Sequence, residues 1–211
     1  MNYLDYLRTD KFPHFWCSGC GNGIVLCAIA RAFEELDLTL ENTVVVTGIG
    51  CWGKADDYVR TNSFHGTHGR ALAFATGIKL ANPSLNVVVL MGDGDGITIG
   101  GNHFIHAARR NVDVTAILVN NFNYGMTGGQ YSGTTPEERI TTTSRYGHIE
   151  EGFDICAVAK AAGARYVARA STENPQQLKN LIRDGIKKQG FACIEAISPC
   201  PTHFGRNNGM R

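Results

Sequence analysis

Residues 86–96 read NVVVLMGDGDG, a run of aliphatic residues that leads directly into a turn of alternating glycine and aspartate. Two other runs, TVVVT at 43–47 and TAILVN at 115–120, have the same uninterrupted aliphatic centre. Short, continuously apolar runs rich in β-branched residues are typical of strands that are buried on both faces of a sheet. We therefore predict that these three segments are central strands of one sheet.

Segments with helical character alternate with these strands. Residues 23–36 carry Val25, Ile29, Ala32 and Leu36 at helical spacing. Further helices are predicted at 70–80, 101–110, 154–162 and 175–188, and weaker strands at 165–168 and 192–197. Strands that alternate with helices form a parallel sheet covered by helices on both faces. We therefore predict an α/β fold and a single domain over residues 1–211.

Two segments lack any periodic apolar pattern. Residues 127–145 are polar and rich in glycine, serine and threonine, which indicates a functional surface loop rather than a domain boundary. The tail, residues 202–211, has no apolar pattern of its own. We expect this tail to be ordered by a partner or a ligand.

Charge and cysteine content exclude several classes of protein. The formal net charge is +1, which gives no footprint for nucleic acid or for an anionic membrane surface. No stretch approaches the roughly 18 apolar residues of a membrane span, and the N-terminal MNYLD lacks the order of a signal peptide. The seven cysteines are an odd number, which argues against a disulfide framework. We expect a cytoplasmic protein that binds neither nucleic acid nor membrane.

The turn that follows NVVVLM has the residues of a phosphate-binding loop. Gly92, Gly94 and Gly96 would let backbone amides approach phosphate oxygens, although a tight acidic turn is the simpler alternative. The next predicted strand ends in Asn120-Asn121, with 25 residues between Gly94 and Asn120. The carboxyl ends of parallel strands meet at one edge of a sheet, where ligands bind. Asp93 and Asn121 are therefore expected close together, as the oxygen ligands that Mg²⁺ prefers beside a phosphate.

Four of the cysteines are expected at the same edge. Cys17 and Cys20 form a CxxC before the first helix, while Cys51 and Cys200 each follow a predicted strand. Four thiolates can hold either a zinc ion or an iron–sulfur cluster, and a CxxC alone can also be a redox pair. A zinc ribbon would normally show a second CxxC. The other cysteines, at 27, 156 and 193, are more typical of small buried hydrophobic residues.

The spacing of Gly-Asp-Gly from Asn-Asn resembles the thiamine-diphosphate signature. The resemblance implies that Asp93 and Asn121 bind Mg²⁺ through their side chains and that Asn123 binds it through its main-chain carbonyl. A register that begins at Gly94 is an alternative, but the first aspartate fits the spacing better. Other residues that the resemblance places at the cofactor are Gly92, Gly94, Asp95, Tyr124, Gly125 and Thr127.

Seven segments extend this resemblance over most of the chain. They are WCSGCG (16–21), GIGCWGK (48–54), FHGTHGRALAFATGIKLANP (64–83), MGDGDG (91–96), GGNHFIHAARRN (100–111), NNFNYGMTGGQ (120–130) and SPCPTHFGRNN (198–208). In this order they resemble the β subunit, the thiamine-binding subunit, of the 2-oxoacid:ferredoxin oxidoreductases. The family implies one [4Fe-4S] cluster on Cys17, Cys20, Cys51 and Cys200. It also implies an α subunit, coenzyme A as acyl acceptor and ferredoxin as electron acceptor.

The resemblance also suggests residues for the substrate. Lys54 is similar to a family lysine near cofactor and substrate, and Trp52 and Gly53 would line the same pocket. His68 is expected to transfer a proton or to orient the reacting carbonyl, although a purely structural hydrogen bond is an equal alternative. Gly128 stands where many members have lysine, and with the ending CPTHFGRNN it resembles the 2-oxoglutarate branch more than the pyruvate branch.

One expected group is absent from the sequence pattern. No glutamate stands in a recognisable motif for activating the aminopyrimidine ring of thiamine, a residue that the family places on the α subunit. We therefore expect this chain to be inactive alone and to work in an αβ heterodimer or an α2β2 assembly. Family members often continue beyond the last cysteine, so a C-terminal segment is expected in the whole protein.

Two other functions fit part of the pattern. A subunit of a non-oxidative thiamine-dependent 2-oxoacid decarboxylase would share the magnesium residues but would need no cluster. A zinc-stabilised interaction module would use the cysteines without any catalysis. The expected activity, oxidative decarboxylation of 2-oxoglutarate to succinyl-CoA with ferredoxin as acceptor, requires both sites on one chain.

Overall fold

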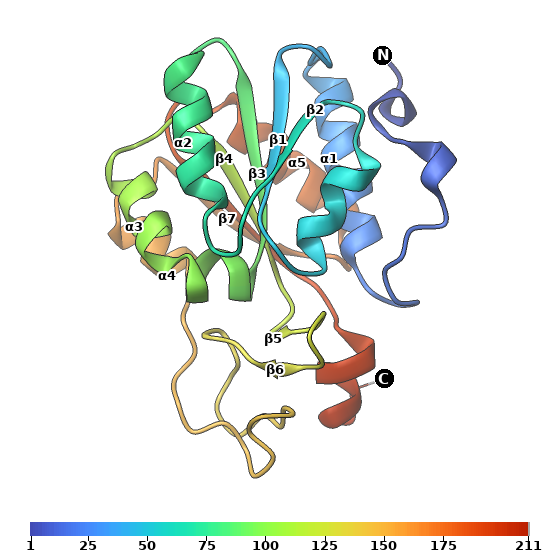
Figure 1. The fold of residues 1–211 in the computed structure, drawn as a ribbon, viewed down its shortest axis with the longest axis vertical. Coiled ribbons are helices and arrows are strands. Elements are labelled where there is room, and N and C mark those ends of the chain that lie inside the picture. Colours follow the sequence, from blue (N-terminus) through green and yellow to red (C-terminus); the bar gives the residue numbers. More distant parts are fainter. Residues whose placement is uncertain (211) are drawn as a thin grey trace.

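The computed structural model describes residues 1–210, and its centre is a parallel sheet of six strands (Figure 1). The strand order is β2-β1-β3-β4-β8-β7, and every neighbouring pair is parallel. The bounds are β1 Thr43–Thr47, β2 Asn62–His65, β3 Asn86–Gly92, β4 Thr115–Asn120, β7 Tyr166–Ser171 and β8 Ala192–Ile197. The predicted α/β fold is confirmed.

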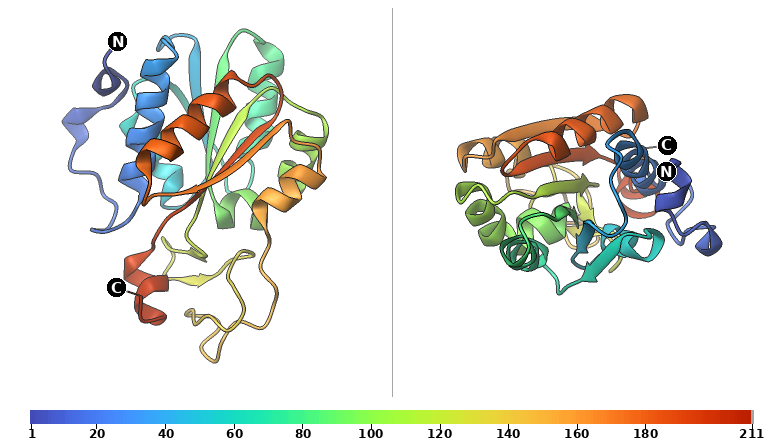
Figure 2. Two further views of the ribbon diagram at one scale, coloured as in Figure 1. Left: turned by 180° about the vertical axis from the view of Figure 1, so that it is seen from behind. Right: turned by 90° about the horizontal axis from the view of Figure 1, so that it is seen from above.

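Helices cover both faces of this sheet. On one face α1 (Asn22–Glu35) and α5 (Pro175–Lys187) lie side by side, as Figure 2 shows in its left view. On the other face lie α2 (Ala71–Ala81), α3 (Gly101–Arg109) and α4 (Ile155–Ala161). Successive strand side chains point to opposite faces, so Val45 packs with the α1 layer while Val44 and Val46 pack with the α2 layer. Both layers are filled by buried aliphatic residues, which fixes the strand ends that carry the site.

The edge strand β2 was not predicted from the sequence. Its four residues, NSFH, are all exposed, so they lack the apolar run that marks the central strands. At the other edge, β7 extends to Ser171, beyond the predicted end at residue 168. Both differences fall on edge strands, where one side of the strand has no neighbour and burial is incomplete.

Beyond the carboxyl ends of the strands lies a separate layer of loops (Figure 1). It contains the short antiparallel pair β5 (Asn123–Tyr124) and β6 (Gln130–Tyr131), and the π-helical segment η5 (Pro201–Gly205). Asn208 exchanges two hydrogen bonds with the backbone of Ile140, and the ring of Phe204 packs against that of Phe122. The described part of the tail is thus tied to the loop at 127–145, while Arg211 lies outside the described residues. The prediction that a partner or a ligand orders residues 202–211 remains a prediction.

Four shorter helical segments complete the described fold. They are the 3₁₀ helices η1 (Tyr3–Tyr6), η2 (Thr9–Lys11) and η3 (Trp52–Tyr58), and the π-helical turn η4 (Gly94–Ile99). π-helical turns are rare in proteins as a whole, but those that occur are often found at functional sites. No helix within residues 1–210 has the length and apolar character that crossing a bilayer requires.

Candidate functional site

Asp93 directly follows β3 and is almost completely buried, with 1% of its surface exposed. Its Oδ2 accepts a hydrogen bond from Ser132 Oγ at 2.5 Å and another from Thr134 Oγ1 at 2.7 Å. Both hydroxyls come from the loop that follows β6. Because they share Oδ2, Oδ1 has no side-chain donor among the described residues. One carboxylate oxygen is thus fixed by the protein and the other is left for a ligand.

The Asp93 carboxyl group is buried without a basic neighbour among the described residues. Burial raises the pKa of this carboxyl group, while hydrogen bonds from Ser132, Thr134 and the backbone of Asn121 act in the opposite direction. The cavity beside Asp93 is lined by no lysine or arginine within residues 1–210. A buried carboxylate without a basic neighbour is stabilised in its charged form by a metal ion.

Asn121 and Asn123 form a tight turn next to Asp93. The Asn123 backbone amide donates to Asn121 Oδ1 at 3.3 Å, and Asn123 Nδ2 donates to the Asn121 carbonyl at 3.0 Å. Phe122, between them, has a φ of 63°, which turns the chain back on itself. Asn123 Oδ1 is buried and has no partner among the described residues. An unpartnered buried acceptor requires a cation or a donor, which fits an oxygen-ligated metal at this turn.

Asp95 has a different role from Asp93, because it joins three strand-end loops. Its Oδ1 accepts hydrogen bonds from His68 Nδ1 at 2.6 Å, from the Gly69 amide at 2.7 Å and from the Ile49 amide at 3.3 Å. These donors follow β2 and β1, while Asp95 follows β3. Its Oδ2 is buried and has no partner within residues 1–210. Asp95 therefore supports the rim of the cavity and leaves one acceptor beside it.

A cavity at the carboxyl ends of β1, β3 and β4 collects most of the predicted cofactor residues. Gly50 leaves one side open, since a Cβ there would meet no atom within 4 Å. Tyr124 closes another side, and its hydroxyl donates to the Gly94 carbonyl at 3.2 Å. The predicted residues that line this cavity are Cys51, Trp52, His68, Gly92, Asp93, Gly94, Asp95, Asn121, Asn123, Tyr124, Gly125 and Thr127.

A second cavity adjoins the first and contains all four predicted cluster ligands. Cys17, Cys20, Cys51 and Cys200 line it together. Burial, together with the neighbouring thiols of Cys20, Cys200 and Cys17, raises the pKa of Cys51 to about 11. Gathered thiols of this kind become thiolate ligands only when a metal is bound. Trp16 Nε1 donates to the Cys51 carbonyl at 2.6 Å and thereby fixes the loop on which Cys51 lies.

The two cavities share one wall. Cys51, Asn121, Gly125 and Met126 line both of them. A Cβ added at Gly125 would lie 3.5 Å from Cys51 Sγ, 3.7 Å from Cys200 Sγ and 3.5 Å from Asn123 Oδ1. Gly125 thus separates the cysteine site from the carboxylate–amide site by the thickness of a backbone. Two chemically different sites in such proximity suit electron transfer between two bound groups.

Comparison with known proteins agrees with this geometry. Residues 46–196 match the family described as "Thiamine pyrophosphate enzyme, C-terminal TPP binding domain". The chain is 54% identical over 209 residues to the 2-oxoglutarate synthase subunit KorB of Methanothermobacter marburgensis, covering 99% of this chain and 73% of the relative. It is 55% identical over 208 residues to the subunit of that name from Methanocaldococcus jannaschii, covering 99% and 77%.

A solved structure is similar over nearly the whole chain. It is the 2-oxoglutarate:ferredoxin oxidoreductase from Magnetococcus marinus with 2-oxoglutarate, coenzyme A and succinyl-CoA bound. The TM-score is 0.93 at 40% identity, over 96% of this chain and 69% of the other. The chain belongs to the β subunits of the 2-oxoacid:ferredoxin oxidoreductase family. It is therefore a subunit of a multi-subunit oxidoreductase, and the predicted family is confirmed.

Two residues predicted for the β-subunit pocket lie outside both cavities. Lys54 is half-buried and its Nζ forms an ion pair with Asp57 at 2.6 Å. Gly53 packs against the Gly48 carbonyl, where a Cβ would approach to 2.5 Å. The structure thus does not bring Lys54 to the cofactor cavity, and its contact with the substrate remains a prediction.

Ser132 and Thr134, which hold Asp93, were not identified from the sequence. The segment around them was recognised as a functional loop, but its many hydroxyl residues gave no indication of which ones reach the site. Cys27, Cys156 and Cys193 line neither cavity, but only Cys193 is buried as predicted, whereas Cys27 and Cys156 are half-buried.

Proposed function

We propose that this β subunit takes part in the oxidative decarboxylation of a 2-oxoacid to its coenzyme A thioester, with ferredoxin as electron acceptor. The observation that carries the proposal is the shared wall between the cavity of Asp93 and the cavity of the four cysteines. We infer that 2-oxoglutarate is the 2-oxoacid and succinyl-CoA the product. The similarity to KorB subunits and to a structure with both molecules bound supports this choice.

Thiamine diphosphate and Mg²⁺ fit the first cavity. Asp93 and Asn121 would hold the metal through side-chain oxygens and Asn123 through its main-chain carbonyl, with diphosphate oxygens completing the shell. The buried and unpartnered Asn123 Oδ1 and the burial of the Asp93 carboxyl group without a lysine or arginine beside it within residues 1–210 support a cation there. The bound cofactor would supply the nucleophilic carbon and the electron sink that loss of CO₂ requires.

A [4Fe-4S] cluster fits the second cavity better than a zinc ion. Tetrahedral zinc holds its sulfur ligands about 3.8 Å apart, given a Zn–S distance of about 2.3 Å. Within residues 1–210, the only group of three ligand atoms that all lie within 4.8 Å of one another is Asp154, Cys156 and Glu195. The four cysteine sulfurs are therefore spread too widely for one ion, whereas a cluster with several metals can span them. Such a cluster would provide a one-electron acceptor beside the first cavity.

His68 is the residue best placed to move a proton in the first cavity. A carboxylate only accepts hydrogen bonds, so the contact with Asp95 places the proton of the neutral imidazole on Nδ1. Nε2 is then the nitrogen available to the substrate. The edge-to-face contact with the Tyr124 ring, at 6.0 Å between centroids, further restricts the imidazole. We propose that His68 Nε2, which has no proton in this tautomer, acts as the base that accepts a proton from a reacting group and, once protonated, donates it to the reacting carbonyl oxygen.

The cofactor cavity needs a second chain to complete it. Within the described residues no glutamate lines either cavity, so the carboxylate that activates the aminopyrimidine ring has no candidate here. We propose that an α subunit supplies this group in an αβ heterodimer or an α2β2 assembly. Coenzyme A and ferredoxin are the other expected partners.

Anaerobic purification with the α subunit tests the proposal. The account predicts four iron and four sulfide per β chain, and reduction of ferredoxin when 2-oxoglutarate and coenzyme A are added together. Pyruvate is the matched control substrate and should react more slowly. Release of CO₂ without any reduction of ferredoxin would instead identify a non-oxidative decarboxylase.

A further inference from the structure

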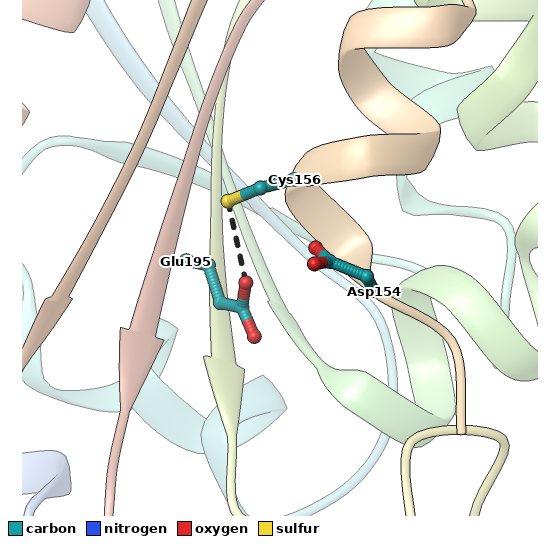
Figure 3. A group of neighbouring side chains, drawn as sticks. All are labelled: Asp154, Cys156 and Glu195. Carbon is teal, nitrogen blue, oxygen red and sulfur yellow. Dashed lines mark hydrogen bonds between the residues drawn. The ribbon is translucent and has the colours of Figure 1, made fainter. Parts of the chain in front are cut away.

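A group of possible metal ligands lies apart from the two cavities and lines neither of them. Figure 3 shows its three members, with the Cys156 thiol in contact with the Glu195 carboxylate and Asp154 nearby. The guanidinium of Arg169 binds both carboxylates, since its Nε lies 2.7 Å from Glu195 Oε2 and its Nη2 lies 2.5 Å from Asp154 Oδ1. A cationic side chain therefore already occupies this group. Iron on the β chain is thus expected at the four cysteines of the second cavity.

Two tryptophans flank two of the expected cluster ligands and pack against each other. Trp16 directly precedes Cys17, and Trp52 directly follows Cys51. Both tryptophans are buried, and their ring centroids lie 5.7 Å apart at an angle of 37°. Trp16 lines the cavity of the four cysteines, whereas Trp52 lines the cavity of Asp93. An aromatic contact thus joins the loops that carry Cys17 and Cys51.

The two indole groups differ in their hydrogen bonding. Trp16 Nε1 donates to the Cys51 carbonyl at 2.6 Å. Trp52 Nε1 is buried and has no partner within residues 1–210. An indole N–H can only donate, so the bond from Trp16 requires the Cys51 carbonyl to face it. Trp16 therefore holds the backbone of Cys51 from the loop that carries Cys17.

The Trp16 ring is itself held by residues that are not expected ligands. Its centroid lies 5.0 Å from that of Tyr58, and the Tyr58 hydroxyl accepts a hydrogen bond from the Phe15 backbone amide at 2.9 Å. The segment before Cys17 is thus attached to η3, the 3₁₀ helix that begins directly after Cys51. Neither attachment depends on a metal, so the fold alone brings these two ligand loops together.

Such an attachment affects both how firmly a cluster is held and how readily it is reduced. Ligands that are held in place by the fold lose less conformational entropy when they bind. The indole N–H also offsets the partial negative charge of the Cys51 carbonyl oxygen. A cluster gains negative charge when it accepts an electron, so a less negative environment favours its reduced form. The hydrogen bond from Trp16 should therefore raise the reduction potential.

We propose that Trp16 is a positioning residue for the cluster ligand Cys51, and that its indole N–H contributes both to the retention of the cluster and to its reduction potential. The inference rests on the proposed function, because it assumes that the four cysteines hold a [4Fe-4S] cluster. Trp16 acts through the backbone of Cys51 and is not itself a ligand.

The test compares Trp16→Phe with the native αβ complex after anaerobic purification. Phenylalanine keeps an aromatic ring but removes the N–H that holds the Cys51 carbonyl. Iron release to a chelator should be about tenfold faster, because loss of a group that orients a metal ligand weakens metal binding by about 10–100-fold. The reduction potential, measured by a redox titration with EPR detection of the reduced cluster, should become more negative. Unchanged iron release, or a potential that stays native or rises, would overturn the proposal.

Tyr6→Phe is the matched control. Tyr6 is buried, its hydroxyl donates to the Leu38 carbonyl at 2.7 Å, and it lines neither cavity. This variant also loses a hydrogen bond to a backbone carbonyl, so it should lower the melting temperature while iron release and potential stay native. Equal acceleration of iron release in Tyr6→Phe and Trp16→Phe would indicate a general loss of stability and would overturn the role of Trp16.

Tyr58→Phe tests the same attachment if Trp16→Phe does not fold. It removes the hydroxyl that holds the Phe15 amide but keeps the Trp16 N–H, so iron release should be faster while the potential stays native. Native iron release in Tyr58→Phe would contradict the attachment. If the native complex holds no iron, the proposed cluster is wrong together with this role. If it holds four iron per β chain and Trp16→Phe behaves as the native complex does, only the role of Trp16 is wrong.

Discussion

His68 Nδ1 lies 2.6 Å from Asp95 Oδ1, and the same oxygen accepts from the Gly69 and Ile49 amides. One buried carboxylate oxygen thus connects the loops that follow β1, β2 and β3. Hydrogen bonds to a charged acceptor contribute about 1.5–3 kcal/mol each when buried. Asp95 therefore stabilises the rim of the cofactor cavity and the orientation of His68 together.

Replacement of Asp95 by asparagine keeps the shape of the side chain but removes the charge. We expect Asp95→Asn to lower the free energy of unfolding by about 1–3 kcal/mol, because three donors lose a charged acceptor. Denaturant unfolding of the chain measures this change. Asp56→Asn is the matched control, since Asp56 contacts His65 at 3.2 Å outside both cavities. A smaller loss for Asp95→Asn than for Asp56→Asn would contradict the role given to Asp95.

Gly48 is required because Asp95 lies against it. A Cβ at Gly48 would lie 2.1 Å from Asp95 Oδ2, and the three hydrogen bonds to Oδ1 prevent that carboxylate from moving. We expect Gly48→Ala to cost about 1–3 kcal/mol of stability and to weaken thiamine diphosphate binding.

The control for Gly48→Ala is Gly77→Ala. Gly77 lies inside α2, and a Cβ there would meet no atom within 4 Å. This variant should gain about 0.4–1 kcal/mol, because alanine reduces the entropy of the unfolded chain. Thermal unfolding and cofactor titration of both variants check the pair. Equal stability of the two variants would show that a Cβ placed against Asp95 does not destabilise the fold.

The ion pair between Glu35 and Lys179 makes stability depend on pH in the acid range. Lys179, and to a lesser extent Arg183, hold the pKa of Glu35 below its ordinary value of 4.5. A lowered folded-state pKa contributes stability that is present above pH 4.5 and is lost as the pH falls through the folded-state pKa. The melting temperatures of the native chain and Glu35→Gln should therefore differ near pH 7 and converge below pH 4. A difference that grows on acidification would contradict this assignment.

The cysteines divide into two groups by position. Cys51→Ser should lose most of the bound iron, because Cys51 lies on the wall shared by the two cavities. Cys193→Ser should keep its iron, since Cys193 lies on β8 and is buried in the core between the sheet and the α2–α4 layer. Iron and acid-labile sulfide assays on anaerobically purified complexes measure both. Loss of iron from Cys193→Ser without loss of folding would contradict the proposed ligand set.

The central fold was predictable because strands that are buried on both faces consist of apolar residues, which the sequence shows directly. β1, β3 and β4 are buried at nearly every position, so each one is an aliphatic run. Arg169 interrupts β7 with a charge, and for this reason the predicted strand ended one residue too early to include it. The pairing of Arg169 with Glu195 on β8 depends on strand order, which no local pattern specifies.

The candidate site was predictable where its residues are next to strand ends. Asp93 and Asn121 directly follow two neighbouring strands, so their spacing in the chain reflects their spacing at the sheet edge. Ser132 and Thr134 reach Asp93 from a loop without periodicity, and only the fold brings their hydroxyls to it. Lys54 shows the opposite case, since a residue three positions from Cys51 turns away to Asp57.

The central claim is that Asp93 and Asn121 hold thiamine diphosphate through Mg²⁺. Calorimetric titration of the cofactor-free αβ complex with thiamine diphosphate, with Mg²⁺ or with a chelator, tests it most directly. The account predicts tight binding only with Mg²⁺. In Asp93→Asn the affinity for thiamine diphosphate should fall by at least about 100-fold, because the carboxylate that holds the metal is removed. Equal affinity in Mg²⁺ and in chelator, for the native complex and for Asp93→Asn alike, would contradict the account.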